Sequence, residues 1–291
     1  MKNKHLLFSV AVVAISMSWL FTACNKSESA SVPSGQQSTT LYMTDAPGIF
    51  DKVFLDIKSV EVLVDTSKNT RSHDGCDWDG LGRRDRQPDS AFVWQNLNAT
   101  AGVYNLLQLK NGVDTLLASA NIKAGSIRLI RIDLGTNNSL VKDSVTYPLN
   151  LVPGLPSYVL IKLTGNEWER TSNSSVRLWL DFDVQRSIVQ LHAGAFYLSP
   201  VIHAFVVSKS GTVVGTVLPR DAWPEIVSLY NSTDTAYAIT NRDGMFMIRG
   251  LKDGTYSAFF NASNGYKDTT ITNITISNAS KVSLGGITLH K

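Results

Sequence analysis

Beyond residue 40 the chain consists of short runs of apolar and β-branched residues, interrupted every few positions by Gly, Pro, Asn or Asp. Runs of this length at this spacing are typical of proteins built from β-strands. No long segment repeats its apolar residues with the 3.6-residue period of an amphipathic helix. The sequence therefore predicts an all-β fold made of two β-sandwich-like domains in tandem, with one helical turn within residues 96–109.

The strand candidates share alternating or continuous apolar residues between turn residues. They are residues 39–44, 53–64, 126–134, 145–151, 158–163, 176–184 and 195–207. Residues 53–64 carry apolar side chains on both faces, which predicts that both faces are covered. In 176–184 the alternation is strict, because side chains point to opposite faces in turn. It predicts a core face of Leu178, Leu180, Phe182 and Val184, and an exposed face of Trp179, Asp181 and Asp183.

The N-terminus has the features of a lipoprotein signal. Lys2 and Lys4 precede an apolar run over residues 6–20, which ends just before Cys24. This run is shorter than the roughly 20 apolar residues that cross a bilayer. We expect cleavage after residue 23 and lipidation of Cys24, which places the protein in the cell envelope, at the outer membrane, on either of its faces. The alternatives are an ordinary secretory signal cut elsewhere and a short N-terminal membrane anchor.

The composition of the chain limits the classes of partner and the covalent cross-links that can be expected. Removal of residues 1–23 takes Lys2 and Lys4 away and so lowers the formal net charge of +3 by two. No cluster of Lys and Arg with interleaved aromatic residues remains, which argues against nucleic acid as a partner. With Cys24 acylated, Cys76 is the other cysteine of the chain, so no intramolecular disulfide is expected. Residues 24–39 are polar and rich in Ser, which predicts a flexible tether.

A series of motifs between residues 40 and 208 carries a family resemblance. The motifs are LYMTDAPG from Leu41, VFLDIKSVEV from Val53, NLLQL from Asn105, IKAGSIRLIRI from Ile122, YPLNLVP from Tyr147, LWLDFDV from Leu178 and YLSPVI from Tyr197. In this order they resemble domain-of-unknown-function family 4382, which is found in exported bacterial lipoproteins. The resemblance implies export and a β-rich domain over residues 40–208, and it implies no established reaction.

Residues 209–291 carry a second resemblance. The segments GTVVGTV from Gly211 and TNRDGMFMIRGLKDGTYS from Thr240 are similar to the carboxypeptidase regulatory-like domain, a seven-stranded sandwich of the prealbumin type. Asp243-Gly244 and Asp253-Gly254 suit tight hairpins, because glycine adopts positive φ at no steric cost. No peptidase is expected despite the name, because the five histidines form no His-Glu-x-x-His motif of a zinc site.

Asp181 and Asp183 form the best candidate carboxylate pair. Two residues apart on one strand, they share a face at roughly 7 Å. Glycoside hydrolysis uses two carboxylates separated by about 5 to 9.5 Å, so the spacing permits it. A structural alternative is solvation, or pairing with Arg128, Arg131 or Arg177. Trp179 beside the pair suggests a third use, a platform on which a sugar ring stacks.

Residues 72–90 form a long loop rich in Gly and charged residues. Asp74, Asp77 and Asp79 resemble part of a calcium loop, but Gly75 occupies the first ligand position and no Glu follows at the required spacing. We therefore expect no metal and no cofactor, with these three as the remaining candidates for metal ligands. Asp45, before Ala46 and Pro47, is interpreted as a turn residue.

Three functions from different classes fit these features. The first is a non-catalytic, lipid-anchored envelope protein that binds a glycan or a protein, because the recognised catalytic motifs are missing. The second is a structural or adhesive subunit, such as a component of a pilus. The third is a glycoside-active enzyme that uses Asp181 and Asp183.

Overall fold

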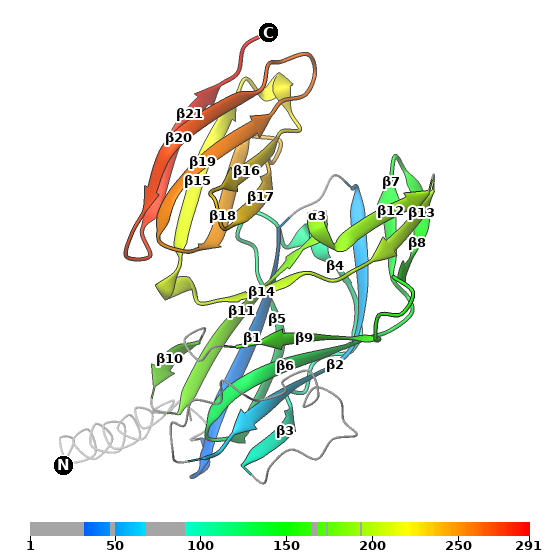
Figure 1. Cartoon of the computed structure of the whole chain (residues 1–291), viewed down its shortest axis with the longest axis vertical. Coiled ribbons are helices and arrows are strands. Elements are labelled where there is room, and N and C mark those ends of the chain that lie inside the picture. Colours follow the sequence, from blue (N-terminus) through cyan, green and yellow to red (C-terminus); the bar gives the residue numbers. More distant parts are fainter. Residues whose placement is uncertain (1–31, 47–49, 68–90, 164–167, 173, 193) are drawn as a thin grey trace, which may run out of the picture. The chain divides into compact units, whose positions relative to one another are not determined.

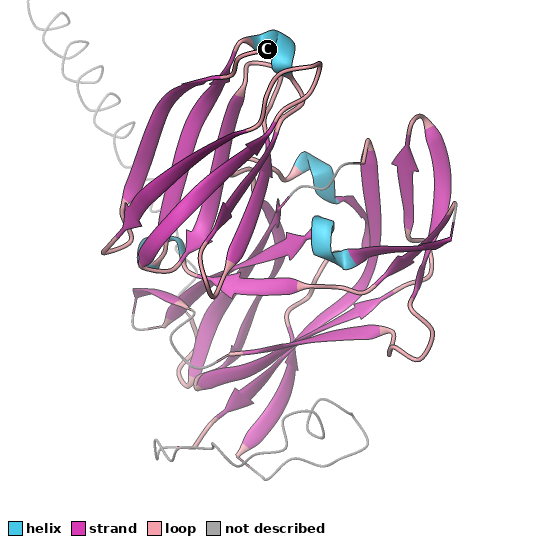
Figure 2. Cartoon of the chain, turned by 45° about the horizontal axis from the view of Figure 1, so that its top comes forward, coloured by secondary structure: helices cyan, strands magenta, loops and turns pink. Residues whose placement is uncertain are grey.

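The computed structural model describes residues 32–46, 50–67, 91–163, 168–172, 174–192 and 194–291. Most of these residues lie in strands, and the described helices are single turns: η1 (Leu106–Gln108), α3 (Val184–Ser187), η2 (Val207–Lys209) and η3 (Arg220–Ala222). The predicted all-β class is thus confirmed (Figure 2). The helical turn expected within residues 96–109 is η1.

The N-terminal two thirds of the described chain build two sheets. The first has the strand order β10-β11-β1-β5, with β14 also paired to β11. Its strands are β10 (Glu169–Ser172), β11 (Ser175–Asp183), β1 (Gln36–Ala46), β5 (Thr115–Lys123) and β14 (Ile202–Phe205). The central pair, β1 and β11, is parallel although more than a hundred residues separate its strands in the chain (Figure 1).

The second sheet has the order β12-β13-β8-β7-β2-β6-β9, with β3 and β4 also paired to β2. Its strands are β12 (Ile188–His192), β13 (Ala195–Leu198), β8 (Val145–Leu151), β7 (Ser139–Lys142), β2 (Lys52–Asp65), β6 (Ser126–Leu134), β9 (Tyr158–Lys162), β3 (Phe92–Asn96) and β4 (Gly102–Asn105). The long strand predicted at 53–64 is β2, and the expectation that both its faces are covered is confirmed. Val62 packs in the main core, whereas Leu63 packs in a second cluster with Phe92 and Leu129.

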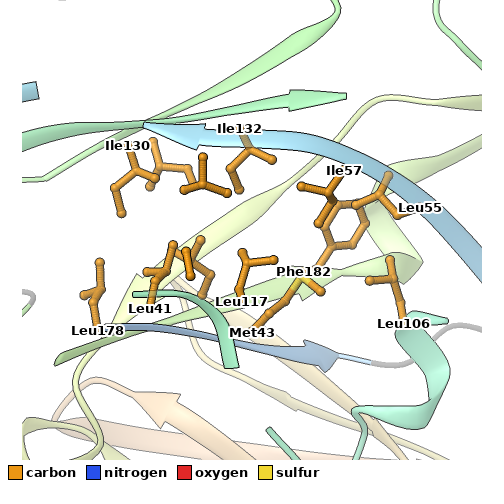
Figure 3. Packing of buried hydrophobic residues seen from close by; sticks show 14 of the residues in the cluster. Leu41, Met43, Leu55, Ile57, Leu106, Leu117, Ile130, Ile132, Leu178 and Phe182 are labelled. Carbon is orange, nitrogen blue, oxygen red and sulfur yellow. The ribbon is translucent and has the colours of Figure 1, made fainter. Parts of the chain in front are cut away.

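The two sheets enclose one apolar core. Figure 3 shows Leu41 and Met43 of β1 on one side of it, and Ile130 and Ile132 of β6 on the other. Phe182 of β11 is fully buried in this cluster, as the alternation of its strand predicts. Burying an aliphatic or aromatic side chain of this size is worth about 1.5–3 kcal/mol, so this layer is the main source of stability for residues 36–206.

The C-terminal part of the chain forms a seven-stranded sandwich. One sheet has the order β18-β15-β21, and the other β17-β16-β19-β20. The strands are β15 (Gly211–Leu218), β16 (Ile226–Tyr230), β17 (Thr235–Ile239), β18 (Met245–Leu251), β19 (Gly254–Asn261), β20 (Thr269–Ile276) and β21 (Lys281–Thr288). Phe246, Ile248, Leu251 and Tyr256 are all buried, as expected. Gly244 has a φ of +78°, and a Cβ there would lie 2.2 Å from the Val217 carbonyl oxygen, so a side chain is excluded. The hairpins predicted at Asp243-Gly244 and Asp253-Gly254 are wrong, because each turn connects strands of different sheets.

These two pairs of sheets have separate apolar cores within one compact unit, Pro33–Lys291. In the described residues, the larger sheets use strands that end by Phe205, and the smaller ones use strands that begin at Gly211. The division into domains of residues 40–208 and 209–291 stays a prediction about independent folding. The tether predicted for residues 24–39 is wrong at its end, because β1 begins at Gln36 and pairs with β5 from there. The single strand predicted for residues 195–207 is two strands, β13 and β14, which pair in different sheets.

Candidate functional site

Trp179 is buried, so the prediction of an exposed aromatic platform on β11 is wrong. The side chain is only 7% exposed. Its ring stacks on that of Tyr42, which lies opposite it on β1, with centroids 5.2 Å apart and an interplanar angle of 17°. Its indole Nε1 donates a hydrogen bond of 2.9 Å to Asp114 Oδ2. The alternation predicted the outer face of the strand correctly, but another part of the chain covers that face.

The cover comes from the loop after η1 and from β18. Asp114, which accepts the Trp179 hydrogen bond, also forms an ion pair with Arg249 of β18. Asn111 of the same loop donates from Nδ2 to the Ile239 carbonyl oxygen at 3.1 Å and accepts from the Met247 amide at 3.4 Å. These polar contacts connect the two sheet pairs, and Trp179 is part of that connection.

Asp181 and Asp183 lie beside this connection and line a cleft of about 430 Å³ with His203 of β14. Asp183 is 2% exposed; it accepts the Arg186 backbone N–H at 2.9 Å as the N-cap of α3 and forms an ion pair with the Arg186 side chain at 3.4 Å. Burial raises the pKa of Asp183 although Arg186 and His203 oppose the shift. The arginine partner of Asp183 is therefore Arg186.

The pairing considered for the three other arginines is wrong for Asp183, because each of them has its own acidic partner. Arg128 pairs with Asp65, Arg131 with Asp133, and Arg177 with Glu169. In each case the carboxylate lies on the same strand as the arginine or on a strand paired with it. Sheet pairing, which the linear sequence does not display, decides the partners of Arg128 and Arg177, whereas Arg131 and Asp133 are two residues apart on one strand.

Asp45 lies at the end of β1, and its surroundings differ from those of a turn residue. It is 5% exposed, and in the described residues neither of its carboxylate oxygens has a hydrogen-bond partner, apart from a weak backbone contact at Val184. Burial, followed by the nearby charges of Asp181 and Asp183, holds the pKa of Asp45 well above its usual range. The parallel register of β1 and β11 places Asp45 opposite Phe182, and so between the two acids. Three carboxyl groups thus meet where the two strands end.

A second concave site is a groove of about 480 Å³ that we call the Trp223 groove. Its volume falls within the range of about 300–1,000 Å³ that is usual for small-ligand sites. One wall comes from the start of β2 and from η1, and the other from the segments around β16 and β19. The lining residues are Phe50, Asp51, Lys52, Asn105, Leu107, Gln108, Lys110, Trp223, Pro224, Ile226, Ile239, Asn261 and Ser263.

A network of hydrogen bonds holds the loop that carries Trp223. The indole Nε1 donates to the Thr240 carbonyl oxygen at 3.0 Å. Asn264 Nδ2 donates to the carbonyl oxygens of Asp221 and Trp223, at 2.8 and 2.9 Å. Ser263 Oγ donates to the Pro224 carbonyl oxygen at 2.6 Å. The half-buried ring is therefore held in position before any ligand arrives, which lowers the entropic cost of binding.

The opposite wall supplies polar groups and a second aromatic ring. Phe50 contacts Phe196 edge to face, with centroids 6.0 Å apart. Asn105 lines the same wall, and its buried Oδ1 has no hydrogen-bond partner among the described residues. Gln108 is exposed at the end of η1. The groove thus combines apolar ring surface with amide groups, the combination that binds sugar rings and their hydroxyl groups.

Sequence reasoning missed this groove because its walls come from distant segments. The available signal was local: Trp223 stands beside Pro224 in a segment with another proline, Pro219, between two strand runs. An aromatic residue in a loop on a rigid β scaffold is a reasonable binding candidate. The partners of Trp223 across the groove are more than a hundred residues away in sequence.

The predicted lipidation site and the candidate metal ligands lie outside the described residues. They are Cys24, Asp74, Asp77 and Asp79. In the part of the chain that the structure describes, no group of three or more His, Cys, Asp or Glu side chains is arranged to hold a metal ion. That same part contains no helix long and apolar enough to cross a membrane.

Comparison with known families identifies the larger part of the chain. A family described as "Domain of unknown function (DUF4382)" matches residues 35–200. The chain belongs to this family. The matched region of the DUF4382 protein contains β1, β11 and the three clustered carboxyl groups, and it supplies one wall of the Trp223 groove. None of the curated proteins matches the chain.

Solved structures resemble the DUF4382 protein only loosely. A type II cohesin–X-dockerin complex from Acetivibrio cellulolyticus is 21% identical over 27% of this chain and 56% of that one, with a TM-score of 0.23. The shaft pilin SpaA from Lactobacillus rhamnosus GG is 10% identical over 87% of this chain and 97% of its own, with a TM-score of 0.22. The minor pilin GBS52 from Streptococcus agalactiae is 12% identical over 87% and 97%, with a TM-score of 0.21. Agreement at this level carries no argument about function.

Proposed function

We propose that this DUF4382 protein is a non-catalytic, lipid-anchored protein of the cell envelope that binds glycans in the Trp223 groove. The observation that carries the proposal is the groove itself, in which the ring of Trp223 is fixed by hydrogen bonds and faces a wall with amide groups. Anchoring through Cys24 at the outer membrane, and a prealbumin-like identity for residues 209–291, are parts of the same proposal that rest on the sequence. The glycan is held by stacking and by hydrogen bonds to its hydroxyl groups.

The clustered acids serve structure rather than catalysis in this proposal. Asp183 caps α3 and pairs with Arg186, and Asp45 is too deeply buried to touch a bound sugar. Perturbed carboxyl groups in a cleft are nevertheless typical of active sites. Release of reducing sugar from glycans by the full chain, and its loss in Asp183→Asn, is the result that would replace this interpretation with the glycoside-active alternative.

A glycan array with the full chain tests the binding proposal. Trp223→Ala is expected to abolish the signal, because it removes the stacking surface. Asn261→Ala, which changes an exposed residue at the end of β19, is expected to weaken binding without affecting folding. Tyr230→Ala is the matched control, since Tyr230 is an exposed aromatic residue outside the groove.

Two results would contradict the proposal. One is glycan binding that survives Trp223→Ala with unchanged affinity. The other is an array on which the folded chain binds no glycan. Self-association of the chain in that second case would favour the structural or adhesive alternative.

A further inference from the structure

The Trp223 groove carries an excess of positive charge on one wall. Lys52, the first residue of β2, and Lys110, two residues after the end of η1, both line it. Asp51 is the acidic residue among the lining residues, and its Oδ2 accepts the Ser144 backbone N–H at 3.0 Å, in the turn between β7 and β8. Asp51 therefore already accepts a hydrogen bond within the protein, and its one negative charge stands against the two positive charges of Lys52 and Lys110.

A further cation lies near the aromatic ring on the other wall. The guanidinium carbon of Arg242 is 5.9 Å from the centroid of the Trp223 ring. One wall of the groove thus has a cation near its aromatic ring, and the opposite wall has two lysines. Together these charges create a positive potential along the groove. A neutral sugar gains nothing from that potential, whereas a negatively charged sugar does.

We propose that the groove selects glycans that carry carboxylate groups, such as uronic acids, over neutral ones. This inference rests on the proposed glycan-binding function and adds the chemical class of the ligand. The sugar ring lies against Trp223, and the carboxylate faces the ammonium groups of Lys52 and Lys110. Lysine acts here as a point charge with three donors, so it needs no fixed bidentate geometry to pair with a carboxylate.

Charge selection is tested with one glycan in two forms. One is oligogalacturonate with free, ionised carboxylate groups, called the free acid below, and the other is its methyl ester. The ester keeps the rings and hydroxyl groups and removes the charge. We expect the full chain to bind the free acid about tenfold more tightly at low salt, because the acid forms two exposed ion pairs that the ester cannot form. This preference is expected to shrink as salt is added, because salt screens exposed charges.

Charge-neutralising variants locate the effect. Lys52→Gln together with Lys110→Gln is expected to lower the ratio of acid affinity to ester affinity from about tenfold to about one. Lys123→Gln is the matched control, because it makes the same charge change at an exposed residue outside the groove. Lys110 also influences Asp45, so the melting temperature of each variant is measured to show that it is folded.

The outcomes separate the inference from the function on which it rests. Equal affinity for acid and ester, with both lost in Trp223→Ala, would overturn charge selection and leave glycan binding intact. A preference for the acid that survives in the double lysine variant would overturn the assignment to this groove. Failure of the folded chain to bind any glycan on the array would overturn both.

Discussion

Replacing Trp179 tests whether this residue stabilises the fold or contacts a ligand. The ring is 7% exposed, stacked on Tyr42, and hydrogen-bonded to Asp114. Trp179→Ala removes a buried aromatic side chain and leaves a cavity, for which the expected loss in the free energy of unfolding is about 3–5 kcal/mol. An exposed side chain would instead change it by no more than about 0.5 kcal/mol.

Trp179→Phe separates the hydrogen bond from the packing. The phenyl ring keeps contact with Tyr42 but has no donor for Asp114. A hydrogen bond to a charged group contributes about 1.5–3 kcal/mol, and we expect a loss near the lower end because Arg249 continues to pair with Asp114. Trp94→Phe is the matched control, since the buried Nε1 of Trp94 has no partner among the described residues and its removal costs no hydrogen bond.

Urea denaturation of the full chain, followed by circular dichroism, measures these differences as shifts of the midpoint at constant slope. The expected order of stability is wild type and Trp94→Phe, then Trp179→Phe, then Trp179→Ala. A Trp179→Ala variant as stable as wild type that has also lost glycan binding would refute the reasoning. It would show that the ring is exposed in solution and acts as the ligand platform.

Three more predictions concern anchoring, folding units and pH. Cys24→Ala is expected to release the protein from the membrane fraction or leave it unprocessed, because the lipid supplies the membrane affinity; unchanged partitioning would contradict lipidation. Residues 209–291 expressed alone are expected to show a β-type spectrum and to melt cooperatively, because they have their own apolar core; a disordered fragment would show that this core depends on the rest of the chain. The pKa of Asp45 is higher in the folded state than the value of 3.8 in the unfolded chain, so the folded state holds its proton to higher pH. Stability is therefore lost as pH rises from 3.8 through the folded pKa, by about 1.4 kcal/mol for each pH unit between the two pKa values. At pH values above the folded pKa, Asp45→Asn is therefore expected to unfold at a higher urea concentration than wild type, and its stability is expected to vary less with pH. An Asp45→Asn variant that is less stable than wild type at neutral pH would contradict the predicted direction.

The local patterns of the sequence determined the fold class and most of the strands. Alternation in residues 176–184 predicted that Phe182 faces the core, and the Asp-Gly pair at 243–244 predicted a tight turn with positive φ at the glycine. That the strands on either side of this turn belong to different sheets, and so form no hairpin, could not be predicted from the pair. The alternation and the turn both depend on interactions within a few residues, such as the two-residue period of a strand and the positive φ of glycine. These properties can be read without knowledge of distant parts of the chain.

The tertiary structure alone decided what covers each face and which side chains meet. A two-residue period shows that Trp179 lies on the outer face of β11, but it contains no information on the loop at Asp114 or on Arg249, which cover that face. Asp45 is buried because β1 and β11 pair in parallel, and long-range pairing of this kind leaves no local mark in the sequence. The Trp223 groove likewise forms between segments far apart in the chain. Burial and binding geometry depend on the packing of distant elements, whereas strand formation depends mainly on neighbouring residues.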